Sequence, residues 1–151
     1  METDKGGQIK VSAYVIDSSV FASIIVKDKF YERASSFLKE CLNKRSLTVD
    51  LSIVETANTL WKHVYLLRRI PVEKLDELRR SIVPLILGAS HVIPSIEVIE
   101  DAVDKAAELG ITVYDSVYIA LAARENCMLA TFDEDLVKLL EKKGLNIAFM
   151  P

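Results

Sequence analysis

The sequence predicts an α/β domain built on a parallel sheet, and three observations support this prediction. The chain has 151 residues, half of them hydrophobic, which is typical of one domain that can bury a core. Short apolar runs alternate with longer segments that carry apolar residues at helical spacing. The longest apolar stretch, residues 82–89, is interrupted by Pro84 and is far shorter than the roughly 20 residues of a membrane-spanning helix. Such alternation of strand and helix favours a parallel sheet covered by helices.

The first half of the chain contains two strand patterns and three helix patterns. A buried strand ends at Asp17. The helix after the second strand has Ser52 as its predicted N-cap and Glu55, three residues on, as its capping-box partner. The predicted strands are 13–16 and 47–49, and the predicted helices are 18–26, 31–42 and 52 to about 69.

The second half continues the alternation. Pro71 is expected to open a helix that bends at Pro84, because proline lacks the backbone N–H that a helix interior uses. A later amphipathic helix should end at Gly110, a residue that favours the left-handed C-terminal conformation. The apolar side of that helix is expected to comprise Ile96, Ile99, Val103 and Ala106. The predicted helices are 71 to about 87, 95 or 96 to 109, 115–126 and 134–143, and the predicted strands are 91–93, 128–131 and 146–150.

The N-terminus and the cysteines bear on the cellular location of the protein. We expect residues 1–10 to form a flexible tail and residues 11–151 a single domain. The tail lacks the apolar segment of a secretory signal, so we expect a cytoplasmic protein with no membrane association. Cys41 and Cys127 show neither metal-binding nor redox spacing and are expected to be reduced core residues.

The overall charge excludes a basic protein that coats nucleic acid, since 19 basic and 22 acidic residues give a net charge of −3. Two stretches, residues 27–45 and 61–80, nevertheless carry a local excess of positive charge. These stretches could form a positive surface around a negatively charged ligand. Solvated helix faces explain the same pattern, and both interpretations stay open at this point.

Acidic residues follow several of the predicted strands, at the edge where ligands of parallel sheets bind. These acids are Asp17, Glu55, Asp115, Asp133 and Asp135. Taken singly, most of them could cap a helix or close a capping box. Taken together they need a partner, because carboxylates about 4 Å apart repel by roughly 4 kcal/mol at an effective dielectric near 20. Mg²⁺ and Mn²⁺, which prefer oxygen ligands, are the suitable cations.

Four segments carry these acids and their polar neighbours: Val15–Ser19, Ser52–Asn58, Tyr114–Ala122 and Thr131–Asp133. In this order and separation they resemble the PIN domain, especially the VapC-type toxin ribonucleases, over nearly the whole chain from Tyr14. The resemblance implies a three-layer α/β/α sandwich around a mostly parallel sheet. It also implies Mg²⁺- or Mn²⁺-dependent endoribonuclease activity, in which metal-activated water cleaves RNA phosphodiester bonds.

The resemblance further implies roles for individual residues and partners. Asp17, Glu55, Asp115 and Asp133 match the family's catalytic, metal-binding acids, Asp135 is a further candidate ligand, and Ser18, Asn58 and Thr131 match supporting positions. Whether Asp133 or Asp135 faces the metal stays open. Lys62, on the same helix face as Glu55, could reach an RNA phosphate, and Arg68 and Arg69 would extend that track. The chain would then be the toxin of a toxin–antitoxin pair, a homodimer with a VapB-type antitoxin as partner.

Two other functions are compatible with parts of the pattern. A PIN scaffold that binds RNA or a partner without cutting is the main alternative, and the presence of all four acids argues against it. A phosphatase of the haloacid-dehalogenase type needs Asp-x-Asp after the first strand, where this chain has Ser19 as the second residue. A phosphoryl receiver needs adjacent acids before Asp17, and these are missing.

Overall fold

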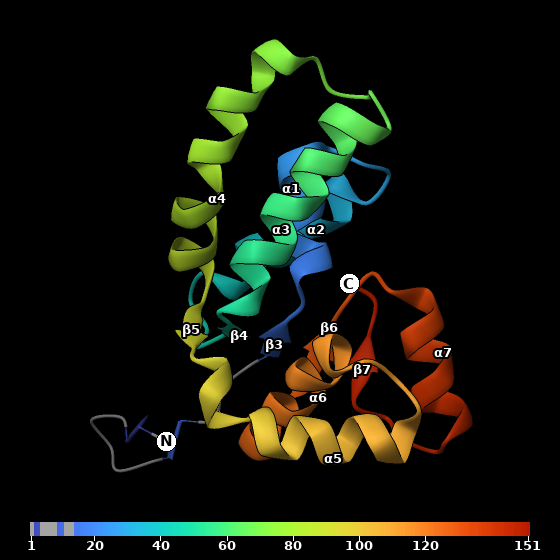
Figure 1. Ribbon diagram of the computed structural model, residues 1–151. Coiled ribbons are helices and arrows are strands. Elements are labelled where there is room, and N and C mark those ends of the chain that lie inside the picture. Colours follow the sequence, from blue (N-terminus) through green and yellow to red (C-terminus); the bar gives the residue numbers. More distant parts are fainter. Residues whose placement is uncertain (1, 4–8, 11–13) are drawn as a thin grey trace.

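Five strands form a parallel sheet at the centre of the computed structural model, which describes residues 2–3, 9–10 and 14–151 (Figure 1). The strands are β3 (Tyr14–Ile16), β4 (Leu47–Val49), β5 (His91–Ile93), β6 (Met128–Ala130) and β7 (Ala148–Phe149), in the spatial order β5-β4-β3-β6-β7. Val15 lies opposite Leu47 on one side and Leu129 on the other. The chain runs outward from β3 first through β4 and then through β6. The carboxyl ends of β3 and β6 therefore mark the switch point where a ligand site is expected.

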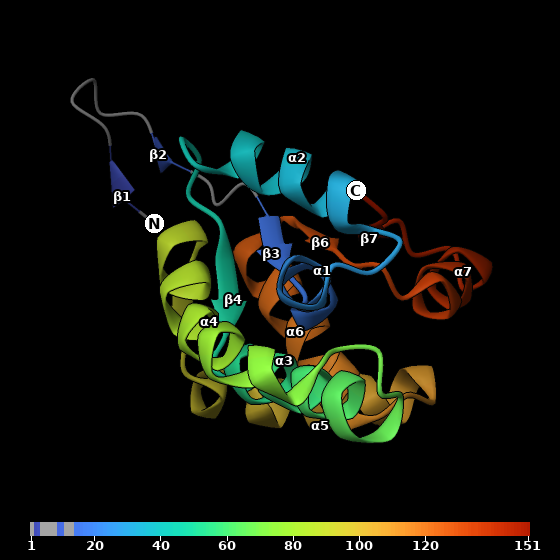
Figure 2. The ribbon, with the colours of Figure 1, turned by 90° about the horizontal axis from the view of Figure 1, so that it is seen from above.

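Helices cover both faces of this sheet and complete the α/β/α sandwich that the sequence predicts. The α-helices of the described residues are α1 (Ser18–Val26), α2 (Tyr31–Cys41), α3 (Leu51–Trp61), α4 (Leu75–Ala89), α5 (Ile99–Leu109), α6 (Val113–Glu125) and α7 (Glu134–Lys142). Ile16 faces a core formed with α1, α2, α4 and the end of α3, whereas Val15 faces a core formed with α5, α6 and α7. Seen from above, α2 and α6 lie on opposite sides of the sheet (Figure 2).

The N-terminal predictions fall partly outside the described residues. Two short strands, β1 (Glu2–Thr3) and β2 (Ile9–Lys10), pair in antiparallel fashion as a sheet of their own. Residues 1, 4–8 and 11–13 lie outside the described part, and so does Ala13 of the predicted first strand. The flexible tail over 1–10 and the domain start at residue 11 stay predictions.

The predicted long helix after β4 is the main error in the first half. Helix α3 ends at Trp61 and passes into a π-helical turn, Lys62–Leu66, so it does not run to Arg69. The chain reverses at Arg68, which has a positive φ of 51°. The predicted capping box is also wrong, because Asp50 occupies the N-cap position and Ser52 Oγ is buried with no hydrogen bond among the described residues.

The predicted apolar side of α5 is wrong as well. A 3₁₀ turn, Ser95–Glu97, precedes the helix, and the residues that pack on the sheet are Val98, Ala102 and Leu109. The buried side is therefore rotated by about one position, which leaves Ile96, Ile99 and Val103 exposed. Gly110 does adopt the predicted left-handed conformation, with φ 69°.

Smaller differences concern the ends of elements. The 71–87 helix begins later, because a 3₁₀ turn at Val72–Lys74 precedes α4, which continues through Pro84 to Ala89. The predicted helix 115–126 begins two residues earlier, because the Thr112 side chain caps α6. The predicted strands at 91–93, 128–131 and 146–150 correspond to β5, β6 and β7, the last two being shorter.

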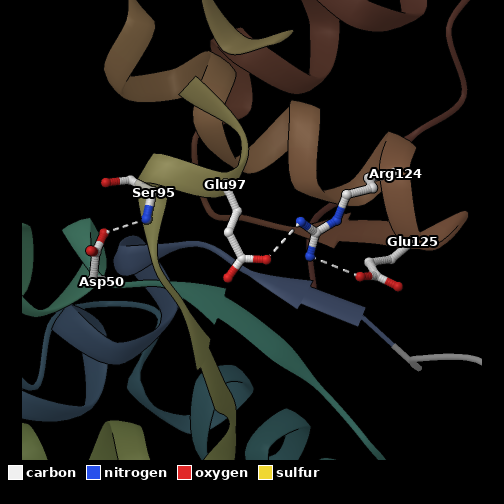
Figure 3. Close-up of polar contacts among 5 residues, drawn as sticks. All are labelled: Asp50, Ser95, Glu97, Arg124 and Glu125. Carbon is white, nitrogen blue, oxygen red and sulfur yellow. Dashed lines mark hydrogen bonds and ion pairs between the residues drawn. The ribbon is translucent and has the colours of Figure 1, made fainter. Parts of the chain in front are cut away.

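Polar contacts fix the 3₁₀ turn between β5 and α5 (Figure 3). The Ser95 amide donates to Asp50 Oδ1 at 3.1 Å, which ties the turn to the start of α3. Arg124, in the last turn of α6, pairs with Glu97 at 3.2 Å and with Glu125 at 3.0 Å. Such exposed ion pairs each contribute less than about 1 kcal/mol to the free energy of unfolding, so their role is to fix the position of the turn.

Both cysteines are free thiols, as predicted. Cys41 is buried, and Cys127 is partly buried beside the core. Burial raises the pKa of the Cys41 thiol above its ordinary value and that of Cys127 to about 11, so neither forms a reactive thiolate near neutral pH. Within the described ranges, no single helix has the length and hydrophobicity to cross a membrane; α5 and α6 pass only as a pair, bent by 112°.

Candidate active site

A cleft of about 340 Å³ lies at the carboxyl ends of β3 and β6, where the topology predicts a ligand site. Carboxylates and hydroxyls dominate its lining, and no lysine or arginine is among the described residues that line it. The lining residues are Asp17, Ser18, Ser19, Ala22, Ser23, Asp28, Phe30, Glu55, Thr59, Asp115, Phe132 and Asp133. The four acids that match the PIN-domain motif therefore share one cleft.

Asp17 follows β3 directly and caps the N-terminus of α1. Its Oδ2 accepts hydrogen bonds from the Ser19 amide at 3.3 Å, the Ser19 hydroxyl at 2.5 Å and the Thr131 hydroxyl at 2.8 Å. Thr131 comes from the end of β6, so this oxygen joins the two strands of the switch point. All of these donors use Oδ2, and no hydrogen bond to Oδ1 is found among the described residues.

Glu55 reaches the cleft from the second turn of α3. The Tyr118 hydroxyl donates to its Oε1 at 2.6 Å, and the Ser18 hydroxyl donates to the same oxygen at 3.2 Å. Glu55 thus connects α3 to α1 and α6. These contacts replace the capping box that the sequence suggests for this residue.

Asp115 and Asp133 come from the first turn of α6 and the N-cap of α7. The Asp115 amide donates to the Thr112 hydroxyl, so its backbone belongs to the helix cap while its side chain lines the cleft. Asp133 Oδ1 accepts from the Leu136 amide at 3.1 Å. Asp133 therefore both caps α7 and contributes to the cleft, two roles that the sequence treats as alternatives.

The electrostatics of the cleft reflect this concentration of acids. Burial raises the pKa of the Asp17 carboxyl, against the hydrogen bonds from Ser19 and Thr131. Burial also raises the pKa of Glu55, opposed by the Tyr118 hydrogen bond and reinforced by the charge of Asp17. The pKa of Asp115 is raised by burial and then by repulsion from Asp133 and Asp17. Burial first, and then repulsion among the acids, therefore disfavours the ionised form of these carboxyls.

The donor set fits a hydrated divalent cation. No group of three His, Cys, Asp or Glu side chains within the described residues stands ready to enclose a metal by itself. Mg²⁺ does not need such a cage, because it keeps several waters and binds through one or two carboxylates. Hard oxygen donors without a competing lysine or arginine suit Mg²⁺ or Mn²⁺.

Several predicted site residues lie elsewhere. Asp135 is exposed in the first turn of α7, and Asn58 is exposed on α3; neither lines the cleft, where Thr59 takes the place expected for Asn58. The predicted RNA-binding residues Lys62, Arg68 and Arg69 are exposed beyond the end of α3. Arg69 also contacts His63 Nδ1 at 3.1 Å.

Sequence reasoning missed several polar residues of the site, among them Ser19, Tyr118 and Asp28. Ser19 bridges Asp17 and the Phe132 amide, and Tyr118 holds Glu55. Asp28 lines the cleft, but both its oxygens accept bonds, from the Ser23 hydroxyl and the Phe30 amide, so it shapes the loop after α1. Ser19 carries a local signal, its place two residues after the strand-ending acid, and Tyr118 belongs to the Tyr114–Ala122 segment that carries the family resemblance.

Comparison with known proteins agrees with this geometry. The PIN domain family model matches residues 14–142. Ribonuclease VapC3 from Pyrobaculum aerophilum is 32% identical over 126 residues, which cover 82% of this chain and 92% of that protein.

Solved structures share the fold. A crystal structure of PAE2754 from Pyrobaculum aerophilum superposes with a TM-score of 0.66 at 21% identity, covering 92% of this chain and 90% of that one. A toxin–antitoxin complex from Klebsiella pneumoniae gives 0.62 at 14% identity, with coverage of 93% and 98%. Because the PIN domain family model matches residues 14–142 and a relative is 32% identical over most of the chain, this chain belongs to the PIN domain family.

Proposed function

We propose that this protein is a Mg²⁺- or Mn²⁺-dependent endoribonuclease. The observation that carries the proposal is the single cleft lined by Asp17, Glu55, Asp115 and Asp133 without a cationic side chain. PIN-domain nucleases generally use divalent metals, and the relative that is 32% identical is a ribonuclease. A phosphodiester is anionic, so these acids alone would repel it.

Each acid of the cleft has a role in the proposed reaction. Asp17, Glu55 and Asp115 would hold the ion directly or through water, and Asp133 would complete the site or orient the attacking water. The bound ion would neutralise the phosphodiester, activate water and stabilise charge that develops on the leaving oxygen. Thr131 and Ser19 keep Asp17 in place, and Ser18 does the same for Glu55. Asp135 and Asn58 are left outside this machinery in our proposal.

We propose that the basic residues that follow α3 bind the RNA. Lys62 follows α3, the helix that brings Glu55 and Thr59 to the cleft, and Arg68 lies at the reversal that follows. Their exposed charges would contact phosphates on either side of the cut, whereas part of Arg69 is engaged by His63. Since the substrate is RNA, we place the activity in the cytoplasm.

We further propose that the protein is the toxin of a toxin–antitoxin pair. The Klebsiella pneumoniae neighbour is such a complex. An apolar groove of about 340 Å³ between α1, α2 and α4, lined by Ile24, Leu38 and Leu85 among others, would accept an apolar helix of a VapB-type antitoxin.

A homodimer is proposed through the exposed side of α5. Ile96 is 81% exposed, and Val103 and Ile99 extend the apolar surface beside it. Light scattering of the purified protein tests this: a dimer that Val103→Lys converts into a monomer is expected, and a monomeric unmodified protein would exclude it.

The enzymatic proposal is tested with a panel of purified RNAs, including ribosomal and transfer RNA, incubated with the protein and Mn²⁺. We expect internal cuts at defined sites, mapped at both new ends, and at least about a 100-fold loss of rate in Asp115→Asn. Asp135→Asn removes the same charge outside the cleft and should cut normally. RNA that is retained on the metal-loaded protein without being cut would instead establish the non-cleaving binding module. Cleavage that persists in Asp115→Asn would also refute the proposal.

A further inference from the structure

Tyr118 is a buried residue whose polar group faces the acid cleft. It lies in the middle of α6, where residues 116–122 are all buried, and its side chain is 1% exposed. A buried tyrosine hydroxyl usually requires a hydrogen-bond partner. The partner here is a carboxylate of the cleft, Glu55 Oε1 at 2.6 Å.

The two donors to Glu55 converge on one oxygen. Oε1 receives the hydroxyls of Tyr118 and Ser18, whereas no hydrogen bond to Oε2 is found among the described residues. A carboxylate oxygen has two lone pairs, so the two donors occupy both sites of Oε1. Only Oε2 then keeps free lone pairs for a ligand in the cleft.

Asp17 shows the same arrangement independently. Ser19 and Thr131 both donate to Oδ2, and no donor within the described residues reaches Oδ1. Two acids that line the cleft thus each have one oxygen without a donor among the described residues, while neutral donors hold the other.

This arrangement affects the choice of cation. Ca²⁺ takes six to eight oxygen ligands and accepts carboxylates through both oxygens, whereas Mg²⁺ demands octahedral geometry and keeps much of its water. Two-oxygen binding by Glu55 would require Oε1 to give up the Tyr118 and Ser18 bonds. One-oxygen binding leaves both bonds intact.

Resting on the ribonuclease proposal, we infer that Tyr118, acting with Ser18, is a positioning residue that restricts Glu55 to one-oxygen binding and so favours a small hydrated cation over Ca²⁺. The Tyr118 hydroxyl is suited to this because its ring is buried and its hydroxyl donates to Glu55 Oε1 at 2.6 Å, beside the donor from Ser18.

The test measures metal affinity without RNA. Mn²⁺ and Ca²⁺ are titrated calorimetrically into the metal-stripped full chain, for the unmodified protein, Tyr118→Phe and Ser18→Ala. Loss of an outer hydrogen bond typically weakens metal binding 10- to 100-fold. We expect the Kd for Mn²⁺ to rise at least about 10-fold in Tyr118→Phe and the Kd for Ca²⁺ to rise less, so that the preference for Mn²⁺ shrinks. Ser18→Ala should shift the preference in the same direction.

The controls separate this role from a purely structural one. Tyr14→Phe removes a phenol hydroxyl at the opposite end of β3 and should leave both affinities unchanged. Ser18→Thr keeps a hydroxyl and should retain the preference. If Tyr118→Phe fails to fold, Ser18→Ala provides the same readout.

Three results would overturn the inference. Unchanged preference in folded Tyr118→Phe and Ser18→Ala would refute the positioning role and leave the ribonuclease proposal intact. Equal weakening of Mn²⁺ and Ca²⁺, with a lower thermal midpoint, would show that Tyr118 supports only the fold. Absence of any Mn²⁺ binding by the unmodified chain would refute the ribonuclease proposal and this inference together.

Discussion

Replacing Asp17 with asparagine separates the metal-binding role of this residue from its structural one. Asparagine keeps an oxygen that can accept from Ser19 and Thr131, and it caps helices as well as aspartate does. The substitution mainly removes a charge from the cleft, where burial already raises the pKa of the carboxyl. We therefore expect the metal-free variant to be at least as stable as the unmodified protein.

The stabilisation by added metal, in contrast, should be smaller in Asp17→Asn than in the unmodified protein. At a Mn²⁺ concentration 100 times Kd, binding adds about 2.7 kcal/mol to the free energy of unfolding. For a chain of this length that raises the thermal midpoint by roughly 5–11 °C. If the loss of one ligand weakens binding about 100-fold, the same Mn²⁺ concentration adds only about 0.4 kcal/mol, or roughly 1–2 °C.

Thermal unfolding of the metal-stripped proteins against increasing Mn²⁺ measures both effects. Asp135→Asn is the matched control, because Asp135 is an exposed acid of α7 that does not line the cleft. It should show the full, saturable rise in midpoint. A full rise in Asp17→Asn, or its loss in Asp135→Asn, would refute our assignment of the metal site.

Three further predictions concern stability. The pKa values of the cleft carboxyls are raised in the folded protein, so protonation of these carboxyls stabilises the fold most at a pH below their ordinary pKa values of 3.8 and 4.5. The thermal midpoint of the metal-free protein should therefore fall as the pH rises above that range, and more steeply than the midpoint of Asp17→Asn. Equal slopes for the two proteins would contradict this. Ser19→Ala removes a hydroxyl that both donates to Asp17 and accepts from the Phe132 amide, and urea unfolding should show a loss of about 1–3 kcal/mol, against a negligible change if the bonds are unimportant. Gly110→Ala should cost about 1–2 kcal/mol because φ is 69°, whereas Gly88→Ala, inside α4 with open space around a Cβ, should gain about 0.5–1 kcal/mol; effects of the same sign would contradict the backbone argument.

The sequence was sufficient to predict the sheet, most helices and the acids of the cleft, because each depends on local information. A buried strand reads as a short apolar run, and an acid directly after it lies at the ligand edge whatever the rest of the chain does. The end of α3 and the buried side of α5 depend on more than the local pattern. Trp61–Leu67 continues an apolar helical pattern, yet the chain leaves the α-helix after Trp61, and the 3₁₀ turn before α5 rotates its pattern by one position.

The contacts that hold the acids were hidden for a similar reason. Tyr118 lies 63 residues from Glu55, and Thr131 lies 114 residues from Asp17, so no local rule connects them. The distinction between Asp133 and Asp135 also required the fold, since both lie near the start of α7 and the structure shows that Asp133, the N-cap residue, lines the cleft.

At Glu55, contacts with distant elements override a local preference. A capping box would satisfy Ser52 and the first turn of α3 without help from other elements. The capping box does not form in the structure. Ser52 Oγ is instead buried without a hydrogen bond among the described residues, which lowers the free energy of unfolding by on the order of 1–3 kcal/mol. The carboxylate is instead held across the core by Tyr118 and Ser18. Departures from local rules concentrate at functional sites, and this departure brings one more carboxylate to the cleft in which we propose that the cation and the RNA bind.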